Sequence, residues 1–317
     1  MQRVSPPDPA TDLFETHRPR LVRLAYRMLG SVAEAEDVVQ NAWLRWRAVD
    51  ADEIREPGAW LTRTTSRLAL DVLKSARARR ETYFGAWLPE PFVETPVDTA
   101  QDDLTLTLMM ALERLSPLER AAFLLHDVFG VGFDEVATTL DRDATAVRQL
   151  AARARRHVRE ARPRYVVERE EGDRIARAFF DASRSGDVGA LTNLLSETVT
   201  LRADGGGKVI AFRNPIEGLA RIQRLYAGLN RKYGTDSFVF LRLLWIDGLP
   251  GFVSLERGRV LQTTALSIED GRIVEIFITR NPDNWPASPP NWSFPVRRPE
   301  LGFRAAPGNA APSGRGS

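Results

Sequence analysis

The stretch that decides the fold is residues 115–164, which read LSPLERAAFLLHDVFGVGFDEVATTLDRDATAVRQLAARARRHVREARPR. Ser116 is placed to cap a first helix that begins at Pro117, and two glycines end that helix. Residues 133–140 have the length and apolar spacing of a short second helix. A polar turn then leads to a third helix, for which Asp143 is the natural N-cap. The stretch therefore predicts three consecutive helices joined by tight turns.

The third helix has an apolar stripe on one face and a basic face opposite. Val147, Leu150 and Ala154 recur at the spacing of one buried stripe. Arg148 and Gln149 point the other way, and in a helix lying in the major groove these side chains suit guanine and adenine, respectively. The pattern is typical of a helix-turn-helix DNA reader, with later arginines suited to phosphates. Its candidate DNA-contacting residues are Arg142, Thr145, Arg148, Gln149, Arg153 and Arg156.

Charge is concentrated in this stretch. The whole chain of 317 residues carries a formal net charge of only +2, but residues 142–164 contain eight arginines against Asp143 and Glu160. That local excess favours a polyanionic partner. The alternative is a helical hairpin with a solvated basic face. The short helix, polar turn and arginine-rich third helix together favour DNA binding.

Composition excludes several classes of protein. The chain has no cysteine, which excludes disulfides, thiolate metal sites and thiol catalysis. Its three histidines have no ligand-like spacing, so neither a metal nor a cofactor is expected. No apolar run approaches the about 20 residues of a membrane helix, and no signal peptide precedes the first helix. These features predict a cytoplasmic protein that makes no contact with a membrane.

The N-terminal part predicts three further helices. Residues 12–29 form the first, and Ser31 caps the next, in which Val38, Ala42 and Leu44 are core candidates. Pro57 opens a third helix with one basic side. Residues 37–40 (DVVQ), 43–46 (WLRW) and 57–71 resemble region 2 of extracytoplasmic-function (ECF) sigma factors. Residues 115–159 resemble region 4 of the same family. The two matches occur in the family's order and cover about half the chain.

The resemblance implies that this chain gives core RNA polymerase its choice of promoter. The helix that docks on core polymerase would present Asp37, Gln40, Leu44 and Arg47. The loop of residues 50–56 and the helix of residues 60–71 would capture the −10 element through Arg55, Trp60, Arg63 and Arg67. Region 4 would read the −35 element. Many family members have asparagine where this chain has Arg67, so the −10 base preference does not carry over.

Residues 81–103 predict a linker that contains the sequence WLPEP. The two prolines favour extended backbone, and a tryptophan in such a segment usually docks on another surface. A local role for the tryptophan, as the cover of an apolar patch, is the alternative. The segment resembles the linker signature of the sigma subgroup with a SnoaL-like C-terminal extension. Its residues are Trp87, Leu88, Pro89, Glu90 and Pro91.

The second half of the chain changes character. Helical patterns at residues 172–184 and 188–195 are followed by strand-like runs at 197–202 and 208–213 and a helical run at 215–233. Four more strand-like runs follow, at residues 238–246, 251–256, 260–268 and 272–279. They are separated by Asp-Gly and Arg-Gly turns, which are strong hairpin signals. The order predicts an α+β domain with a curved sheet around a helix. It resembles the cone-shaped fold of nuclear transport factor 2 and SnoaL-like cyclases.

Two further motifs resemble signatures of the sigma-attached SnoaL-like domain. They comprise Asp204, Gly205, Gly206, Gly207 and Lys208, and then Asn281, Pro282 and Asp283. The glycine run suits a tight strand turn or a surface that contacts another domain, and it lacks the pattern of a phosphate-binding loop. With the WLPEP linker, these motifs are the candidate regulatory contacts.

The full prediction is a multidomain chain with two all-α sigma domains followed by the α+β cone. The predicted boundaries are 10–80 for region 2, 81–103 for the linker, 104–164 for region 4, 170–286 for the cone domain and 287–317 for a flexible tail. The predicted function is that of a non-catalytic sigma factor, with core RNA polymerase and promoter DNA as partners and regulation in cis by the cone domain.

Two other classes of function stay open at this stage. One is an isomerase or cyclase with carboxylate chemistry at Asp181, Asp204 or Glu217. No histidine follows His157, although acid–base catalysts most often use one. The other is a stand-alone regulator that binds a small molecule in the C-terminal domain, which leaves the polymerase-like helix at residues 37–47 unexplained.

Overall fold

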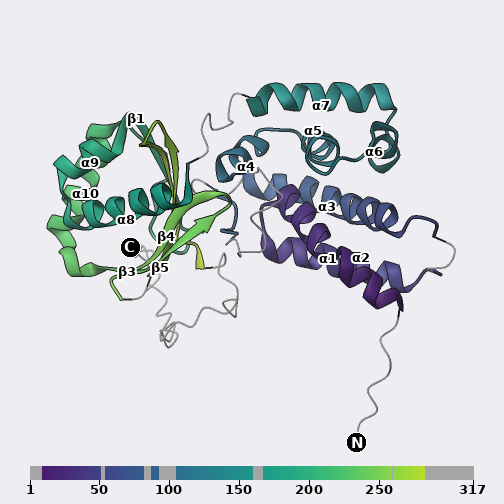
Figure 1. Cartoon of the computed structure of the whole chain (residues 1–317), viewed down its shortest axis with the longest axis horizontal. Helices are drawn as coiled ribbons and strands as arrows, with labels where there is room; N and C mark the ends of the chain where they lie inside the picture. Colours follow the sequence, from purple (N-terminus) through teal and green to yellow (C-terminus); the bar gives the residue numbers. More distant parts are fainter. Residues whose placement is uncertain are drawn as a thin grey trace, which may run out of the picture. The chain divides into compact units, whose positions relative to one another are not determined.

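The computed structural model describes residues 9–50, 54–81, 87–92, 105–159, 167–258 and 260–282 (Figure 1). The predicted tail at 287–317, Asp283 and most of the predicted linker lie outside these residues. Residues Met1–Pro286 group into one compact unit.

The first part of the chain is entirely helical. Helix α1 (Pro9–Leu29), α2 (Val32–Arg47) and α3 (Pro57–Glu81) pack against one another as a bundle. Ser31 caps α2 by accepting a hydrogen bond from the Glu34 amide, and Gly30, with φ of 69°, makes the tight connection between α1 and α2. The prediction that Leu44 belongs to the core is wrong. Leu44 is 57% exposed, whereas Val38, Ala42 and Trp46, which the same pattern also predicts for the core, are buried.

The second helical bundle contains α4 (Leu106–Leu112), α5 (Pro117–Phe123), the π-helical turn η3 (Leu124–Val128), α6 (Phe133–Leu140) and α7 (Ala144–Arg159). Ser116 and Glu119 form a reciprocal capping box at the start of α5. Asp141 adopts φ of 54° between α6 and α7, and the Asp143 carboxylate accepts the Ala146 amide at 2.7 Å. Local side-chain caps thus begin α5 and α7, while α6 follows Gly132 without a side-chain cap. One apolar cluster runs through both bundles.

The remaining described residues form a helix-and-sheet domain. Helices α8 (Arg169–Ser185), α9 (Val188–Leu194) and α10 (Leu219–Tyr233), with the 3₁₀ turn η4 (Thr235–Ser237), accompany six strands. The strands are β1 (Leu195–Asp204), β2 (Ile216–Glu217), β3 (Phe238–Ile246), β4 (Leu249–Glu256), β5 (Val260–Glu269) and β6 (Arg272–Thr279). The strand order is β2-β1-β6-β5-β4-β3, in which only the β1–β6 pair is parallel.

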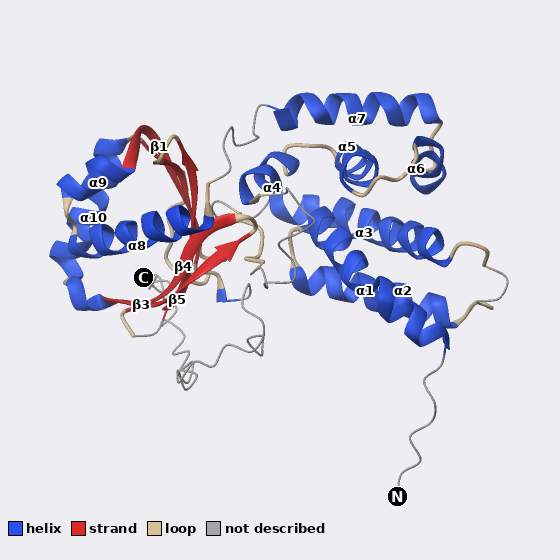
Figure 2. Ribbon diagram, in the orientation of Figure 1, coloured by secondary structure: helices blue, strands red, loops and turns tan. Residues whose placement is uncertain are grey.

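The predicted curved sheet around a helix is confirmed. Helix α8 contacts β3 and β4, and α10 contacts β1 and β2, so the helices cover one face of the sheet (Figure 2). A second apolar cluster, centred on residues such as Phe179 and Ile276, fills the space between them. The two-residue hairpin turns Asp247-Gly248 and Asp270-Gly271 have left-handed backbone at both central residues, with φ of 46° and 70° in the first. This is the type I′ geometry that matches strand twist.

Two predictions for this domain are wrong. Residues 208–213 do not form a strand, and the helix predicted from residue 215 begins at Leu219. Instead, Gly206 and Gly207 take left-handed φ values of 65° and 69° and turn the chain into an irregular loop. The two-residue strand β2 then pairs with β1 before α10 begins.

Candidate DNA-binding, polymerase-binding and interdomain surfaces

Helix α7 separates its buried and exposed side chains cleanly. Val147, Leu150, Ala151, Ala154 and Val158 are buried. The six candidate DNA-contacting residues are all exposed, and they are Arg142, Thr145, Arg148, Gln149, Arg153 and Arg156. Helix α7 packs on α4, α5 and α6 through its apolar face, while Arg153, Arg155 and Arg148 of its polar face contact Glu119, Asp127 and the Phe133 ring.

Not all of these arginines are equivalent. Arg153 donates to the Glu119 carboxylate at 2.8 Å, so it ties α7 to the capping box of α5. Burial opposes ionisation of Glu119, but hydrogen bonds from Arg153 and Ser116 outweigh it and hold the Glu119 pKa below its usual value. Arg148 lies 5.3 Å above the Phe133 ring and has no acidic partner among the described residues. Arg148 is therefore held in place without its charge being neutralised.

The four candidate polymerase-binding residues share one exposed face of α2. Asp37, Gln40, Leu44 and Arg47 follow a spacing of three, four and three residues, and all four are exposed. The Arg47 guanidinium lies 5.8 Å from the ring of the half-buried Trp43. Leu44 is the most exposed large apolar side chain of α2, and it lies on this face between Gln40 and Arg47.

The candidate −10 residues lie in different surroundings. Arg55 is exposed before α3, and Trp60 packs on Trp46 with ring centroids 5.6 Å apart. Arg63 is partly buried, and its Nε has no hydrogen-bond partner among the described residues. Arg67 is engaged within the chain, since its guanidinium donates to the carbonyls of Thr138 at 2.7 Å and Thr139 at 3.0 Å.

Further arginines connect the two helical bundles in the same way. Arg20 of α1 donates to the Phe129 carbonyl at 2.8 Å. The buried Arg120 of α5 donates twice to the Arg27 carbonyl, at 3.0 and 3.1 Å, and also pairs with Glu113. Each contact places a cation on backbone oxygens near the end of a helix, where the helix dipole favours positive charge. Together with Arg67, they hold α1–α3 and α4–α7 together.

The linker tryptophan covers the turn between α1 and α2. Trp87 packs so closely on Gly30 that a Cβ there would approach the indole to 2.5 Å, and Leu88 is fully buried. The Glu90 amide donates to the Gly30 carbonyl at 2.8 Å. The linker is therefore attached to the start of the helix whose other end carries the candidate polymerase-binding face.

The Glu90 side chain acts as a second cap of α2. Its carboxylate accepts hydrogen bonds from the amides of Val32 and Ala33 and from the Ser31 hydroxyl. Burial raises the pKa of Glu90 above its ordinary value, and these hydrogen bonds offset only part of the shift. A carboxylate from 58 residues away thus satisfies helix amides that usually depend on a local cap.

The two C-terminal motifs meet the same linker. The Leu88 amide donates to the buried Asp204 carboxylate at 3.0 Å, and the other oxygen of Asp204 accepts the Gly206 amide at 2.8 Å. Gly206 lies against the Asn281 side chain, and a Cβ at Gly206 would come within 2.1 Å of it. Gly205 is similarly close to the Val209 carbonyl. The structure therefore brings the linker, the glycine-rich loop and Asn281 together. Gly207, Lys208 and Pro282 are the sequence neighbours of these contacting residues.

Asp247 is the residue that sequence reasoning missed. It was predicted only as a turn residue, yet its side chain is fully buried. It accepts the Tyr26 hydroxyl at 3.0 Å, the Arg27 guanidinium at 3.1 Å and the Phe92 amide at 3.3 Å. Its backbone also exchanges hydrogen bonds with Phe92 and Leu106. The only signal in the sequence was an Asp in a hairpin turn between strongly apolar strands, which does not reveal a partner 221 residues away.

We call this set of contacts the clasp, and it comprises Tyr26, Arg27, residues 87–92, Asp204 and Asp247. At its centre, Arg27 binds Asp247 of the C-terminal domain through its side chain and Arg120 of α5 through its carbonyl. Arg27 and Asp247 are 6% and 0% exposed, so their ion pair is shielded from solvent. All three parts of the described chain meet at this residue.

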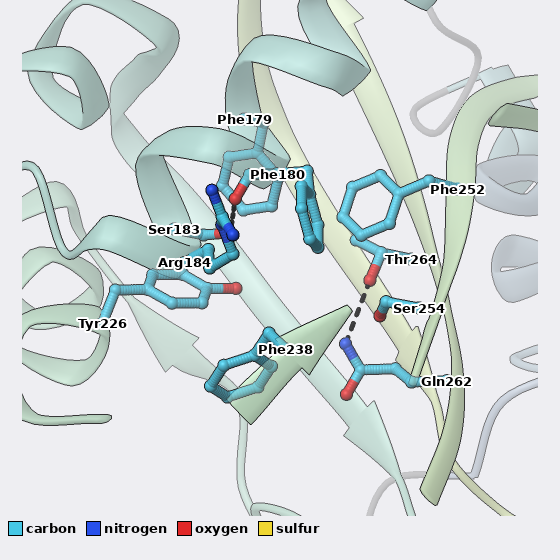
Figure 3. Close-up of a pocket in the computed structure, with 10 residues that line it drawn as sticks. All are labelled: Phe179, Phe180, Ser183, Arg184, Tyr226, Phe238, Phe252, Ser254, Gln262 and Thr264. Carbon is cyan, nitrogen blue, oxygen red and sulfur yellow. Dashed lines mark hydrogen bonds between the residues drawn. The ribbon is translucent and has the colours of Figure 1, made fainter. Parts of the chain in front are cut away.

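The C-terminal domain also contains a small pocket with an empty volume of about 340 Å³, part of it open to solvent. Five of its ten lining residues are aromatic, and Arg184, Tyr226 and Ser254 contribute polar groups to the lining (Figure 3). Burial raises the pKa of the Tyr226 phenol, and its hydroxyl has no hydrogen-bond partner among the described residues. The lining residues are Phe179, Phe180, Ser183, Arg184, Tyr226, Phe238, Phe252, Ser254, Gln262 and Thr264.

The carboxylates considered for catalysis do not line this pocket. Asp181 pairs with Arg177 on the surface of α8, Asp204 holds the linker, and Glu217 is exposed on β2. Within the described ranges, no cluster of three or more His, Asp or Glu side chains is arranged to hold a metal ion. None of the helices that the structure describes has the length and apolar content needed to cross a bilayer.

Comparison with known proteins identifies the family. Residues 13–79 match the model of Sigma-70 region 2, and residues 105–158 match that of Sigma-70 region 4. The ECF RNA polymerase sigma factor SigJ of Mycobacterium tuberculosis strain H37Rv is 39% identical over 298 residues, covering 87% of this chain and 93% of SigJ. The chain belongs to the ECF family of RNA polymerase sigma factors.

Other relatives agree with this assignment. The ECF sigma factor SigI of M. tuberculosis strain CDC 1551, described as probable, is 33% identical over 87% of this chain and 94% of its own length. The crystal structure of SigJ superposes with a TM-score of 0.69 at 33% identity, covering 86% of this chain and 97% of that structure. Sigma factors are non-catalytic subunits that direct RNA polymerase to promoters. The enzyme interpretation is therefore not favoured, and the helix-and-sheet domain is the C-terminal part of an ECF sigma factor.

Proposed function

We propose that this sigma factor reads the −35 element through Arg148 and Gln149, with Arg142, Thr145, Arg153 and Arg156 on the flanking phosphates. The observation that carries the proposal is that all six side chains are exposed, five of them on α7 and Arg142 in the turn that precedes it. The −10 element is captured by Arg55, Trp60, Arg63 and Arg67, and the chain acts in the cytoplasm with the polymerase. We keep the predicted domain boundaries, 10–80, 81–103, 104–164, 170–286 and 287–317, as part of this proposal.

The direct test is transcription by core RNA polymerase, with and without the purified chain, on a library of promoter sequences. We expect promoter-specific initiation only when the chain is present. Absence of stimulation from every promoter in the library would contradict the assignment of the DNA-reading residues.

We also propose that Asp37, Gln40, Leu44 and Arg47 form the surface that binds core polymerase. Asp37→Lys should weaken capture of core polymerase without unfolding the chain, because exposed substitutions typically change stability by less than about 0.5 kcal/mol. Lys74→Glu on α3 is a suitable control, since Lys74 is also exposed and lies on another helix. Equal capture by both variants would contradict the assignment.

The third proposal is that the SnoaL-like domain regulates the sigma factor in cis through the clasp. It is supported by the shared position of Arg27, which is bound by Asp247 and Arg120 at once. Arg67, a proposed −10 residue, is engaged on the carbonyls of α6 in the same state. In a chain held this way, region 4 occupies part of the −10 surface. Regions 2 and 4 must therefore separate before the chain captures a promoter.

The regulation can be tested with Trp87→Ala, which removes the side chain that covers Gly30. Transcription at equal protein concentration should differ from that of the full chain, because effective concentrations within one chain are on the order of mM and even a weak contact matters. Substitution of the exposed Arg174 on α8 is the control. Unchanged transcription by Trp87→Ala, with normal folding, would contradict regulation through the linker.

A small-molecule ligand in the pocket of Figure 3 is a fourth, separate proposal. The unpartnered Tyr226 hydroxyl and the Arg184 Nε, which has no hydrogen-bond partner among the described residues, would suit an apolar molecule with one acceptor group. Titration with benzoate and with neutral benzyl alcohol, followed by NMR, should shift Tyr226 and its neighbours if the pocket is used. No shift with either probe would leave the clasp as the regulatory site and remove the ligand from the proposal.

A further inference from the structure

Helix α10 of the SnoaL-like domain has a continuous basic stripe. Its exposed cations are Arg221, Arg224, Arg231 and Lys232, and its 15 residues include no Asp or Glu. At 100° per residue these four side chains fall within about a third of the helix circumference, opposite the buried Leu219 and Ile222. Arg221 and Arg231 are about 15 Å apart along the axis.

Helix α8 of the same domain shows what an ordinary solvated surface looks like. There, Arg174 pairs with Glu171 at 3.7 Å and Arg177 pairs with Asp181 at 3.1 Å. Each acid lies three or four residues from its arginine, which is the spacing at which side chains on a helix meet. The cations of the α10 stripe have no such partners among the described residues. Glu217 and Asp236 are the nearest acids in sequence, and they lie outside the helix at its two ends.

The stripe is held on a fixed support. The Gln223 side chain donates to Thr192 of α9 at 2.7 Å, and the Asn230 side chain donates to the Arg184 carbonyl of α8 at 2.9 Å. Gly228 is exposed within the stripe, and a Cβ there would meet no atom within 4 Å. Its lack of a side chain leaves the backbone open between the two pairs of cations, where a ligand could approach closely.

We propose that the α10 stripe binds the phosphate backbone of promoter duplex DNA, independently of sequence. Four cations without acidic partners match the charge of a duplex, which carries one negative charge per about 1.7 Å of axis. The length of about 15 Å between Arg221 and Arg231 corresponds to about four base pairs on one strand at about 3.4 Å each. The SnoaL-like domain is then a third DNA-contacting part of the holoenzyme. This inference rests on the sigma function but not on the clasp or on any base contact of α7.

The test compares two matched pairs of substitutions in the full chain bound to core polymerase. Arg221→Gln with Arg224→Gln removes two stripe cations, and Arg174→Gln with Arg177→Gln removes two acid-paired cations at the same spacing on α8. Affinity for a promoter duplex is measured by fluorescence anisotropy over a range of salt concentrations. The slope of log affinity against log salt concentration should be smaller in magnitude by about two for the stripe variant than for the unmodified chain. The affinity that the stripe variant loses between about 50 and 200 mM salt is then about tenfold smaller.

Three further measurements keep the outcome clear. Thermal unfolding shows whether each variant is folded, and Arg221→Lys with Arg224→Lys should retain the slope because a phosphate contact needs only the charge. Arg231→Gln with Lys232→Gln should lower the slope as the first pair does.

Equal slopes for the α8 and α10 variants would overturn the proposal. So would weaker binding of core polymerase without DNA, because the stripe would then be a protein contact. Absence of promoter binding by the unmodified chain with core polymerase would instead count against the proposed promoter contacts of the sigma factor.

Discussion

Two helices of this sigma factor are capped by a glutamate, and the two glutamates come from very different places. Glu119 lies three residues after Ser116 and completes a local capping box at the start of α5. Glu90 reaches the start of α2 from a linker 58 residues further along the chain. A local cap stabilises one helix wherever the rest of the molecule lies. A distant cap stabilises its helix only while the linker is bound, so the same chemistry becomes a connection between domains.

Whole regions of the molecule differ in the same way between contacts close in sequence and contacts distant in sequence. The reader bundle α5–α7 is built from contacts close in sequence, whereas the clasp joins residues 64 to 221 positions apart. We therefore expect substitutions in the reader to change DNA binding and substitutions in the clasp to change how the domains are held together.

The largest effect is expected at Asp247. Asp247→Ala leaves the buried Arg27 guanidinium without its anion, and breaking a buried ion pair in this way costs about 3–5 kcal/mol. The Tyr26 hydroxyl and the Phe92 amide lose an acceptor as well. Chemical denaturation monitored by tryptophan fluorescence measures the change. Asp247→Asn is the control that retains acceptors while removing charge, and it should be intermediate. A loss below about 1 kcal/mol for the alanine variant would show that the clasp is not a stable contact.

The next effect tests the reader alone. Arg148→Ala should cost about 1–3 kcal/mol of −35 binding if Arg148 makes a bidentate base contact. Its exposed position predicts little change in the free energy of unfolding. Electrophoretic mobility shifts with the specific promoter and with scrambled duplexes give the measurement. An equal loss on both would make Arg148 a phosphate contact, and Arg156→Ala, also exposed on α7, provides that reference behaviour.

Removal of each glutamate cap should separate the two regions directly. Loss of a helix cap costs about 0.5–2 kcal/mol in either helix. Glu90→Ala should additionally free the linker, so hydrogen exchange at the Leu88 and Phe92 amides should increase. Glu119→Ala should leave these two amides protected, because its contacts are confined to Ser116 and Arg153. Similar exchange of the Leu88 amide in both variants would show that Glu90 does not hold the linker.

The same distinction explains how much could be read from the sequence. Ser116, Asp143 and the Asp-Gly turns act through residues within four positions, so the helices of the reader and the strands β3–β6 were predicted closely. The sequence predicts a strand at residues 208–213 because residues 209–212 form a short apolar run, but the path of this loop is set by Gly206 against Asn281. Asp247 was missed for the same reason, since burial by a distant bundle leaves no periodic trace in the chain.

The smallest predicted effect, and the most specific, is that the contributions of Glu90 and Glu119 to folding stability change with pH in opposite directions. The pKa of Glu90 is raised by burial, so the folded state holds this proton more tightly than the unfolded state, whose glutamate titrates near 4.5. The stability of the wild type relative to Glu90→Gln should therefore fall as pH rises from about 4.5 through the raised pKa. The pKa of Glu119 is lowered, because its bonds to Arg153 and Ser116 exceed the burial penalty. The stability of the wild type relative to Glu119→Gln should thus be lost as pH falls below about 4.5. Urea denaturation of the wild type and of each glutamine variant across this pH range gives two stability differences as functions of pH. If both differences change in the same direction with pH, the predicted distinction between the local cap Glu119 and the distant cap Glu90 is wrong.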